Sequence, residues 1–86
     1  MLGPQFSPPQ TDEQRAEYAL SLQIAGEDKM SQFAFKAASD YMIAAADIYV
    51  NIAKTSKNSE LVARARQKLG PLLDRVLQIN FTSPLD

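Results

Sequence analysis

The alanine-rich segment from Ser31 to Lys54 limits what this chain can fold into more than any other part of the sequence. Placed at about 100° per residue, its apolar side chains gather on one broad side of a helix. They are Ala34, Ala37, Ala38, Tyr41, Ala45, Ile48, Tyr49 and Ile52, with Phe35, Met42, Ala46 and Ala53 at the margins. This arc spans roughly 200°, wider than the ~100° that suffices for one partner. We therefore expect a helix packed between two neighbours, as in a three-helix bundle.

Two further amphipathic segments supply these neighbours. The first runs from Thr11 to about Lys29, and Thr11 with Gln14 has the spacing of a capping box. Gly26 and the charged residues after it predict the end of this helix. The second begins near Ser59, a predicted N-cap, and repeats apolar residues at offsets of three and four: Val62, Ala65, Leu69, Leu72, Leu73, Val76 and Ile79.

Gly70 and Pro71 fall inside this last segment. An interior proline removes one backbone hydrogen bond and clashes with the preceding turn, which costs about 3 kcal/mol if nothing relieves it. We expect either one kinked helix or two shorter helices joined at Gly70. No segment shows strand alternation and no unit repeats. The predicted fold is therefore all-α, an antiparallel three-helix bundle whose third helix is kinked at Gly70-Pro71.

The predicted domain covers residues 11–79. Residues 1–10 hold three of the five prolines and predict a disordered, proline-rich leader, and residues 80–86 are expected to form a tail. A chain of 86 residues has room for a single hydrophobic core.

Composition argues against several classes of function. The chain has neither cysteine nor histidine, the residues that most often serve as thiol nucleophiles, general bases and metal ligands. Its net charge is −1, so no positive field attracts nucleic acid. The longest apolar run, Tyr41 to Ala46, is far shorter than the ~20 residues that span a bilayer. We expect a protein that is not an enzyme, carries no cofactor or metal, binds no nucleic acid and does not insert directly into membranes.

Two surface features allow a binding interpretation as well as an ordinary one. Ile43 and Val50 lie seven residues apart in the middle of the polar face of the second helix. They are either isolated surface residues or one wall of a groove for an amphipathic helix. Arg64, Lys68 and Arg75 form a basic stripe on the third helix. This stripe is either a solvated face or a rim that attracts acidic residues of a ligand.

The second and third helices together resemble the MIT domain, the microtubule-interacting and trafficking module. Ala37, Tyr41, Ala44 and Ile48 match the family's alanine–tyrosine spacing on its second helix. The segment Leu72-Leu73-Asp74-Arg75, with Lys68 before it, is similar to the family's third-helix motif. The resemblance covers residues 11–79. Val76-Leu77 stands where the family has Ala-Glu, and Gln32-Phe33 replaces its Gly-x-Tyr.

The resemblance implies a non-catalytic adaptor. Domains of this family bind helical or extended tail peptides of ESCRT-III subunits, in the groove between helices two and three or between helices one and three. The implied partners are C-terminal tails of ESCRT-III-like proteins, and the implied location is the cytoplasm with recruitment to endosomes. The candidate peptide-binding residues are Ile43, Val50, Lys68, Leu73, Asp74 and Arg75. Leu73, with Lys68, Asp74, Ile43 and Val50, would line the groove between helices two and three, whereas the kink at Gly70-Pro71 would favour the groove between helices one and three. Lys68 and Arg75 would orient the ligand by pairing with its carboxylates.

Two other functions remain open. In one, the chain is a helical oligomerisation domain that buries Ile43, Val50 and Leu77 against a second copy. In the other, it is a regulatory subunit that contributes surface to a catalytic partner. The adaptor interpretation expects a monomer, whereas the first alternative expects self-association.

Overall fold

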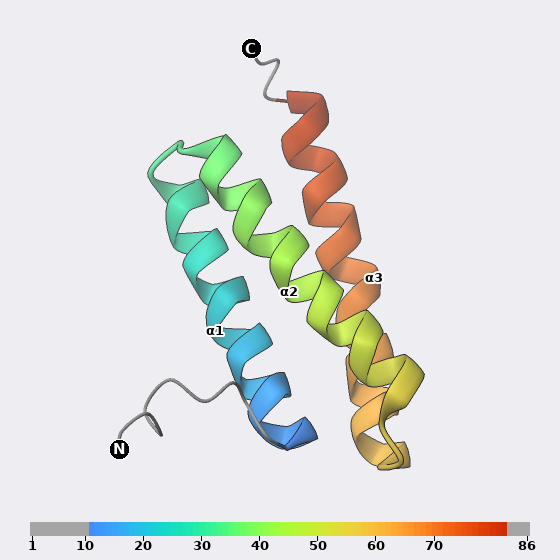
Figure 1. Ribbon diagram of the computed structural model, residues 1–86. Helices are drawn as coiled ribbons and strands as arrows, with labels where there is room; N and C mark the ends of the chain where they lie inside the picture. The colour runs from blue at the N-terminus through green and yellow to red at the C-terminus, as the bar shows by residue number, and fades with distance from the viewer. Residues whose placement is uncertain (1–10, 83–86) are drawn as a thin grey trace, which may run out of the picture.

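The computed structural model describes residues 11–82, and these residues form three helices (Figure 1). They are α1 (Asp12–Ser31), α2 (Phe35–Thr55) and α3 (Ser59–Thr82). Successive helices run in opposite directions, and no strand occurs in residues 11–82. The all-α, antiparallel three-helix prediction is confirmed. α3 ends three residues beyond the predicted domain boundary at Ile79, while the predicted leader and residues 83–86 of the predicted tail lie outside the described residues.

Side-chain caps define where α1 and α3 begin. The Thr11 hydroxyl accepts a hydrogen bond from the Gln14 amide at 3.0 Å, and the Gln14 side chain accepts one from the Thr11 amide at 3.1 Å. The predicted capping box is therefore confirmed. At α3 the cap is Asn58 and not the predicted Ser59. The Asn58 side-chain oxygen accepts hydrogen bonds from the backbone amides of Glu60 and Leu61. Asparagine is among the preferred N-cap residues, because its side-chain oxygen can accept from the amides of the first helical turn.

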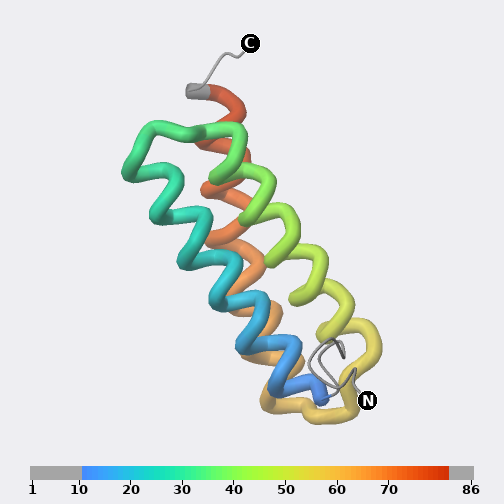
Figure 2. The backbone as a smooth tube through the Cα atoms, turned by 60° about the vertical axis from the view of Figure 1, so that its left-hand side comes forward, coloured from blue at the N-terminus to red at the C-terminus, as the bar shows by residue number. Residues whose placement is uncertain are grey.

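α2 is the middle helix of the bundle. Both α1 and α3 pack along it (Figure 1), and the turned view of Figure 2 shows α3 crossing behind the other two helices. α1 and α3 make few contacts with each other. The buried apolar residues come mainly from α2 and α3, with Ala19 alone from α1: Ala19, Ala38, Met42, Ala45, Ala46, Tyr49, Ile52, Leu61, Ala65, Leu72, Val76 and Ile79. The wide apolar arc of the sequence thus corresponds to a helix covered on two sides.

Gly26 lies inside α1, which continues two residues beyond the predicted end near Lys29. It is buried, and a Cβ at this position would stand 2.8 Å from Met42 Cγ and 3.2 Å from the Ala38 carbonyl oxygen. Gly26 therefore allows α1 to approach α2 closely. Packing outweighs the weak helix propensity of glycine, and α1 continues to Ser31.

α3 runs through Gly70 and Pro71 without interruption. Of the two predicted arrangements, the structure has one continuous helix. Proline crowds the Cβ of the residue before it and so disfavours helical geometry there, but Gly70 has no Cβ. Pro71 is also exposed, so its ring requires no space in the core. The apolar phase carries across the joint, and Leu72, Val76 and Ile79 are all buried.

Candidate functional site

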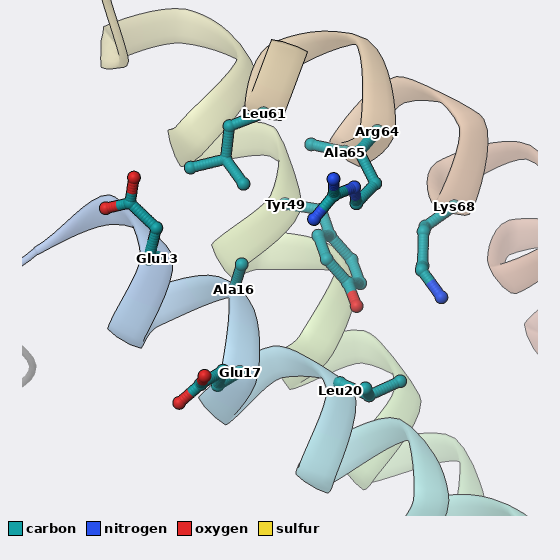
Figure 3. A pocket seen from close by; sticks show the side chains of 9 residues that line it. All are labelled: Glu13, Ala16, Glu17, Leu20, Tyr49, Leu61, Arg64, Ala65 and Lys68. Carbon is teal, nitrogen blue, oxygen red and sulfur yellow. The ribbon is translucent and has the colours of Figure 1, made fainter. Parts of the chain in front are cut away.

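A cavity of about 260 Å³ lies between α1 and α3, above the middle helix. It follows from the sparse contact between the two outer helices. Figure 3 shows its lining from all three helices: Glu13, Ala16, Glu17 and Leu20 from α1, Tyr49 from α2, and Leu61, Arg64, Ala65 and Lys68 from α3. Apolar side chains therefore meet charged ones at a single hollow.

Tyr49 forms the floor of this cavity. Its side chain is almost fully buried, and burial raises the pKa of its hydroxyl above the ordinary value. In Figure 3 the ring stands between α1 and α3, and its hydroxyl end lies between Leu20 and Lys68. The sequence analysis assigns Tyr49 to the core, which is confirmed. The structure adds that the same ring is the base of a surface hollow.

The two walls of the cavity carry opposite charges. Glu13 and Glu17 come from α1, and Arg64 and Lys68 from α3. In the view of Figure 3 the Arg64 side chain points toward the Tyr49 ring, whereas the two carboxylates point away from it. Within residues 11–82, neither Arg64 nor Lys68 forms an ion pair. The α1 wall of the cavity is therefore acidic and the α3 wall basic, and the two cations of the α3 wall are not held in ion pairs within residues 11–82.

A second cavity, of about 350 Å³, lies further along α1 and α3. Five of its seven lining residues are polar: Gln23, Glu27, Pro71, Leu72, Asp74, Arg75 and Gln78. Arg75 crosses from α3 to α1 and donates to Glu27 from Nη2 at 2.9 Å and from Nε at 3.3 Å. The carboxylate raises the pKa of Arg75 through this hydrogen bond, which also links the two outer helices.

The structure divides the six predicted peptide-binding residues between two surfaces. Lys68 lines the first cavity, and Asp74 and Arg75 line the second, so these three lie along the groove between α1 and α3. Ile43, Val50 and Leu73 are between 40% and 47% exposed and line neither cavity.

Helical geometry places Ile43, Val50 and Leu73 on the opposite side of the bundle. On α2, Tyr41 and Ala44 line a shallow cavity with Leu22 of α1, and Ile43 and Val50 lie across the buried arc from them. On α3, Leu73 and Leu77 lie across the buried arc from Lys68 and its neighbours. We call the exposed set Ile43, Val50, Leu73 and Leu77 the outer edge.

Sequence reasoning did not find the part of the site that α1 contributes. Leu20 lies in the first amphipathic segment, yet it is 40% exposed on the cavity wall, and Ile24 one turn later is 60% exposed. The missing information was the distance between α1 and α3, because an apolar stripe looks the same in a closed and an open bundle. Arg64, in contrast, was visible as a member of the basic stripe.

The described residues contain neither a cluster of metal-ligating side chains nor a helix suited to cross a membrane. In residues 11–82 no three His, Cys, Asp or Glu side chains converge as metal ligands would. None of the three helices combines the length and the apolar character needed to cross a bilayer. Comparison with protein-family models finds no match for this chain, and searches of curated proteins and of solved structures find no similar one.

Proposed function

We propose that this domain is a non-catalytic adaptor that binds a short amphipathic peptide in the groove between α1 and α3. The observation that carries the proposal is the apolar cavity over Tyr49 with the unpaired Arg64 and Lys68 on its wall. An apolar side chain of the ligand fills the hollow and supplies affinity. Ligand carboxylates meet the two cations and set its orientation.

The ligand class comes from charge and from the MIT resemblance of the sequence. The two cations of the α3 wall, beside an apolar hollow, favour a peptide that places acidic residues against α3 and large aliphatic residues in the hollow. C-terminal tails of ESCRT-III-like subunits are the peptides that the resemblance suggests, and they would bring the host protein to endosomal membrane-remodelling machinery. A hollow of about 260 Å³ holds one or two side chains, so we expect Kd values of micromolar to hundreds of micromolar.

The test is an NMR titration of the labelled domain with acidic, leucine-rich ESCRT-III tail peptides. We expect the largest shifts at Leu20, Tyr49 and Lys68. Reversing both cations, Arg64→Glu with Lys68→Glu, should raise Kd about tenfold or more, because the peptide's carboxylates then face like charges.

Arg66→Glu is the matched control for this pair. Arg66 lies on the same helix and is exposed, but it does not line the cavity, so one charge reversal there should leave Kd within about twofold. If no peptide of the panel shifts any resonance at millimolar concentration, the proposed function is wrong. If Arg66→Glu weakens binding as much as the pair does, the cavity is not the binding site.

Self-association is the second candidate, and the outer edge favours it. Ile43, Val50, Leu73 and Leu77 expose large apolar surface along one side of α2 and α3. Sedimentation equilibrium separates the two functions. A monomer at high micromolar concentration excludes the oligomerisation domain, and a dimer that Leu77→Asp dissociates supports it.

A further inference from the structure

The walls of the first cavity carry opposite charges that do not pair with each other. On α1, the Glu17 carboxylate is exposed and forms no hydrogen bond or ion pair within residues 11–82, and Glu13 accepts only from the Asn58 side chain at 3.3 Å. On α3, the side chains of Arg64 and Lys68 have no such partner in the same part of the chain. Both walls therefore keep charge that a ligand can meet.

The register of α1 against α3 explains why these charges stay apart. Further along the groove, Glu27 and Arg75, which are 48 residues apart in the sequence, face each other and pair at 2.9 Å. The two helices run in the same direction (Figure 1), so the same offset puts Lys68 about level with Leu20, and Glu17 about level with an alanine of α3. Opposite charges therefore meet at the second cavity, whereas each charge of the first cavity faces an apolar residue across the hollow.

Neighbouring charged residues leave the sign of each wall unchanged. Arg15 of α1 donates to Asn51 and Thr55, so it faces the end of α2 and not the cavity. Glu60 in the first turn of α3 is exposed, and it is not among the residues that line the cavity. A ligand in the first cavity therefore meets carboxylates on α1 and cations on α3.

A hollow with an apolar floor and two walls of opposite sign suits a ligand with three faces. An extended peptide alternates its side chains between two faces, one toward the floor and one toward solvent. A helix presents an apolar row and two separate flanks at once. In the view of Figure 3 the carboxylates of α1 point away from the Tyr49 ring, so a ligand reaches them with long side chains that lie over the wall. Lysine and arginine have this reach.

Building on the peptide binding proposed above, we propose that the ligand of this groove is an amphipathic helix with one acidic and one basic flank, and that Glu17 selects the basic flank. The acidic flank lies against Arg64 and Lys68, the aliphatic row enters the hollow, and lysine or arginine side chains cross the α1 wall to Glu17. The lining of α3 runs from Leu61 to Lys68, about two turns, so a short ligand helix covers the cavity. A helix can enter in either direction, and one of the two brings its acidic flank to α3.

Three synthetic peptides of matched helicity, with the same leucine row, test the proposal. The split peptide carries glutamates on one flank and lysines on the other, the mixed peptide has the same composition with both signs on each flank, and the acidic peptide carries glutamates on both. By NMR titration of the domain, we expect the split peptide to bind about fivefold more tightly than either of the others. If the mixed or the acidic peptide binds as tightly, the split-flank ligand is wrong although peptide binding stands. If none of the three binds at millimolar concentration, both proposals fail.

Glu17→Lys should reverse the preference. It replaces attraction by repulsion on the basic flank, so the split peptide should bind about fivefold more weakly, and the acidic peptide should bind more tightly by a similar factor. Asp28→Lys is the matched control, because Asp28 is exposed on α1 but lines neither cavity of the groove, and both Kd values should stay within about twofold. A general loss of structure would weaken both peptides together. If Glu17→Lys moves both affinities in the same direction, or if Asp28→Lys has the same effect as Glu17→Lys, Glu17 does not select the ligand.

Discussion

Gly26 determines how closely the first two helices pack. Its missing side chain leaves room for Met42 Cγ and for the Ala38 carbonyl oxygen, both closer than a Cβ would tolerate. Gly70 differs, because a Cβ there would meet no atom within 4 Å outside its chain neighbours. The two helical glycines therefore serve different needs: close approach between helices at position 26, and room for the following proline at position 70.

Gly26→Ala should destabilise the domain by about 1–2 kcal/mol, because overpacking outweighs the gain in helix propensity. Urea unfolding followed by circular dichroism measures the effect. In a Met42→Ala background the same substitution should cost less, since the contact at 2.8 Å is then gone. If Gly26→Ala lowers the free energy of unfolding equally in both backgrounds, the contact with Met42 is not the cause of the destabilisation.

Asp12 ties the start of α1 to the loop before α3. Hydrogen bonds from the side chains of Ser56 and Arg15 lower the pKa of Asp12 below its ordinary value of 3.8. Arg15 in turn donates to Asn51 and Thr55 near the end of α2. One short polar network thus joins the start of α1 to the end of α2 and to the loop after it.

Asp12→Asn should lower stability at neutral pH. Because the pKa of Asp12 is lower in the folded than in the unfolded chain, its contribution is full above the unfolded pKa and is lost as the pH falls through the folded pKa. Wild type and variant should therefore converge in strongly acidic buffer, as thermal unfolding at a series of pH values would show. A constant difference at every pH would mean that the carboxylate charge plays no part.

At the scale of elements, α3 is a long helix that tolerates an internal proline. Pro71 cannot donate to the carbonyl four residues before it, so that hydrogen bond is missing from the middle of α3. The buried residues on either side, Ala65 and Leu72, keep the helix on α2. Tertiary packing therefore maintains a helix that local propensity would interrupt.

Pro71→Ala should stabilise the domain by about 1–3 kcal/mol, because it restores the backbone hydrogen bond and removes the ring clash. Pro71 is exposed, so little packing is lost. The urea concentration at the midpoint of unfolding measures this change, and it should be higher for the variant. A lower midpoint would mean that the ring stabilises the cavity wall beside Arg75.

At the scale of the whole molecule, the bundle is open on one side. α1 and α3 share α2 but make few contacts with each other, and the Arg75–Glu27 pair bridges part of the remaining gap. The result is two candidate binding surfaces: the groove between α1 and α3, and the outer edge on the other side of α3. A single substitution distinguishes them.

Leu73→Asp should leave the fold intact, since Leu73 is 47% exposed, and should leave peptide affinity in the α1/α3 groove within about twofold. Circular dichroism and the peptide titration together provide the check. Loss of binding with a folded variant would move the site to the outer edge, where Ile43, Val50 and Leu73 are exposed. Loss of the fold would show that Leu73 supports the core.

Helical periodicity determined the three helices, their order and the middle position of α2, since an apolar arc covered on two sides can be recognised residue by residue. Helix ends were less predictable. The place of Gly26 inside α1 depends on its contact with α2. The start of α3 depends on which of the neighbouring residues Asn58 and Ser59 serves as the N-cap. The candidate site was predicted in part: Lys68, Asp74 and Arg75 lie along one groove, while Ile43, Val50 and Leu73 lie elsewhere.

Only the tertiary structure decided how far α1 stands from α3, and therefore that Tyr49 and Leu20 line an open cavity. It also decided that Phe33 occupies a left-handed turn with its ring exposed. The physical reason is the same in both cases. A sequence records which side chains avoid water along one helix, whereas the separation of helices and the path of a turn depend on how all three surfaces fit together.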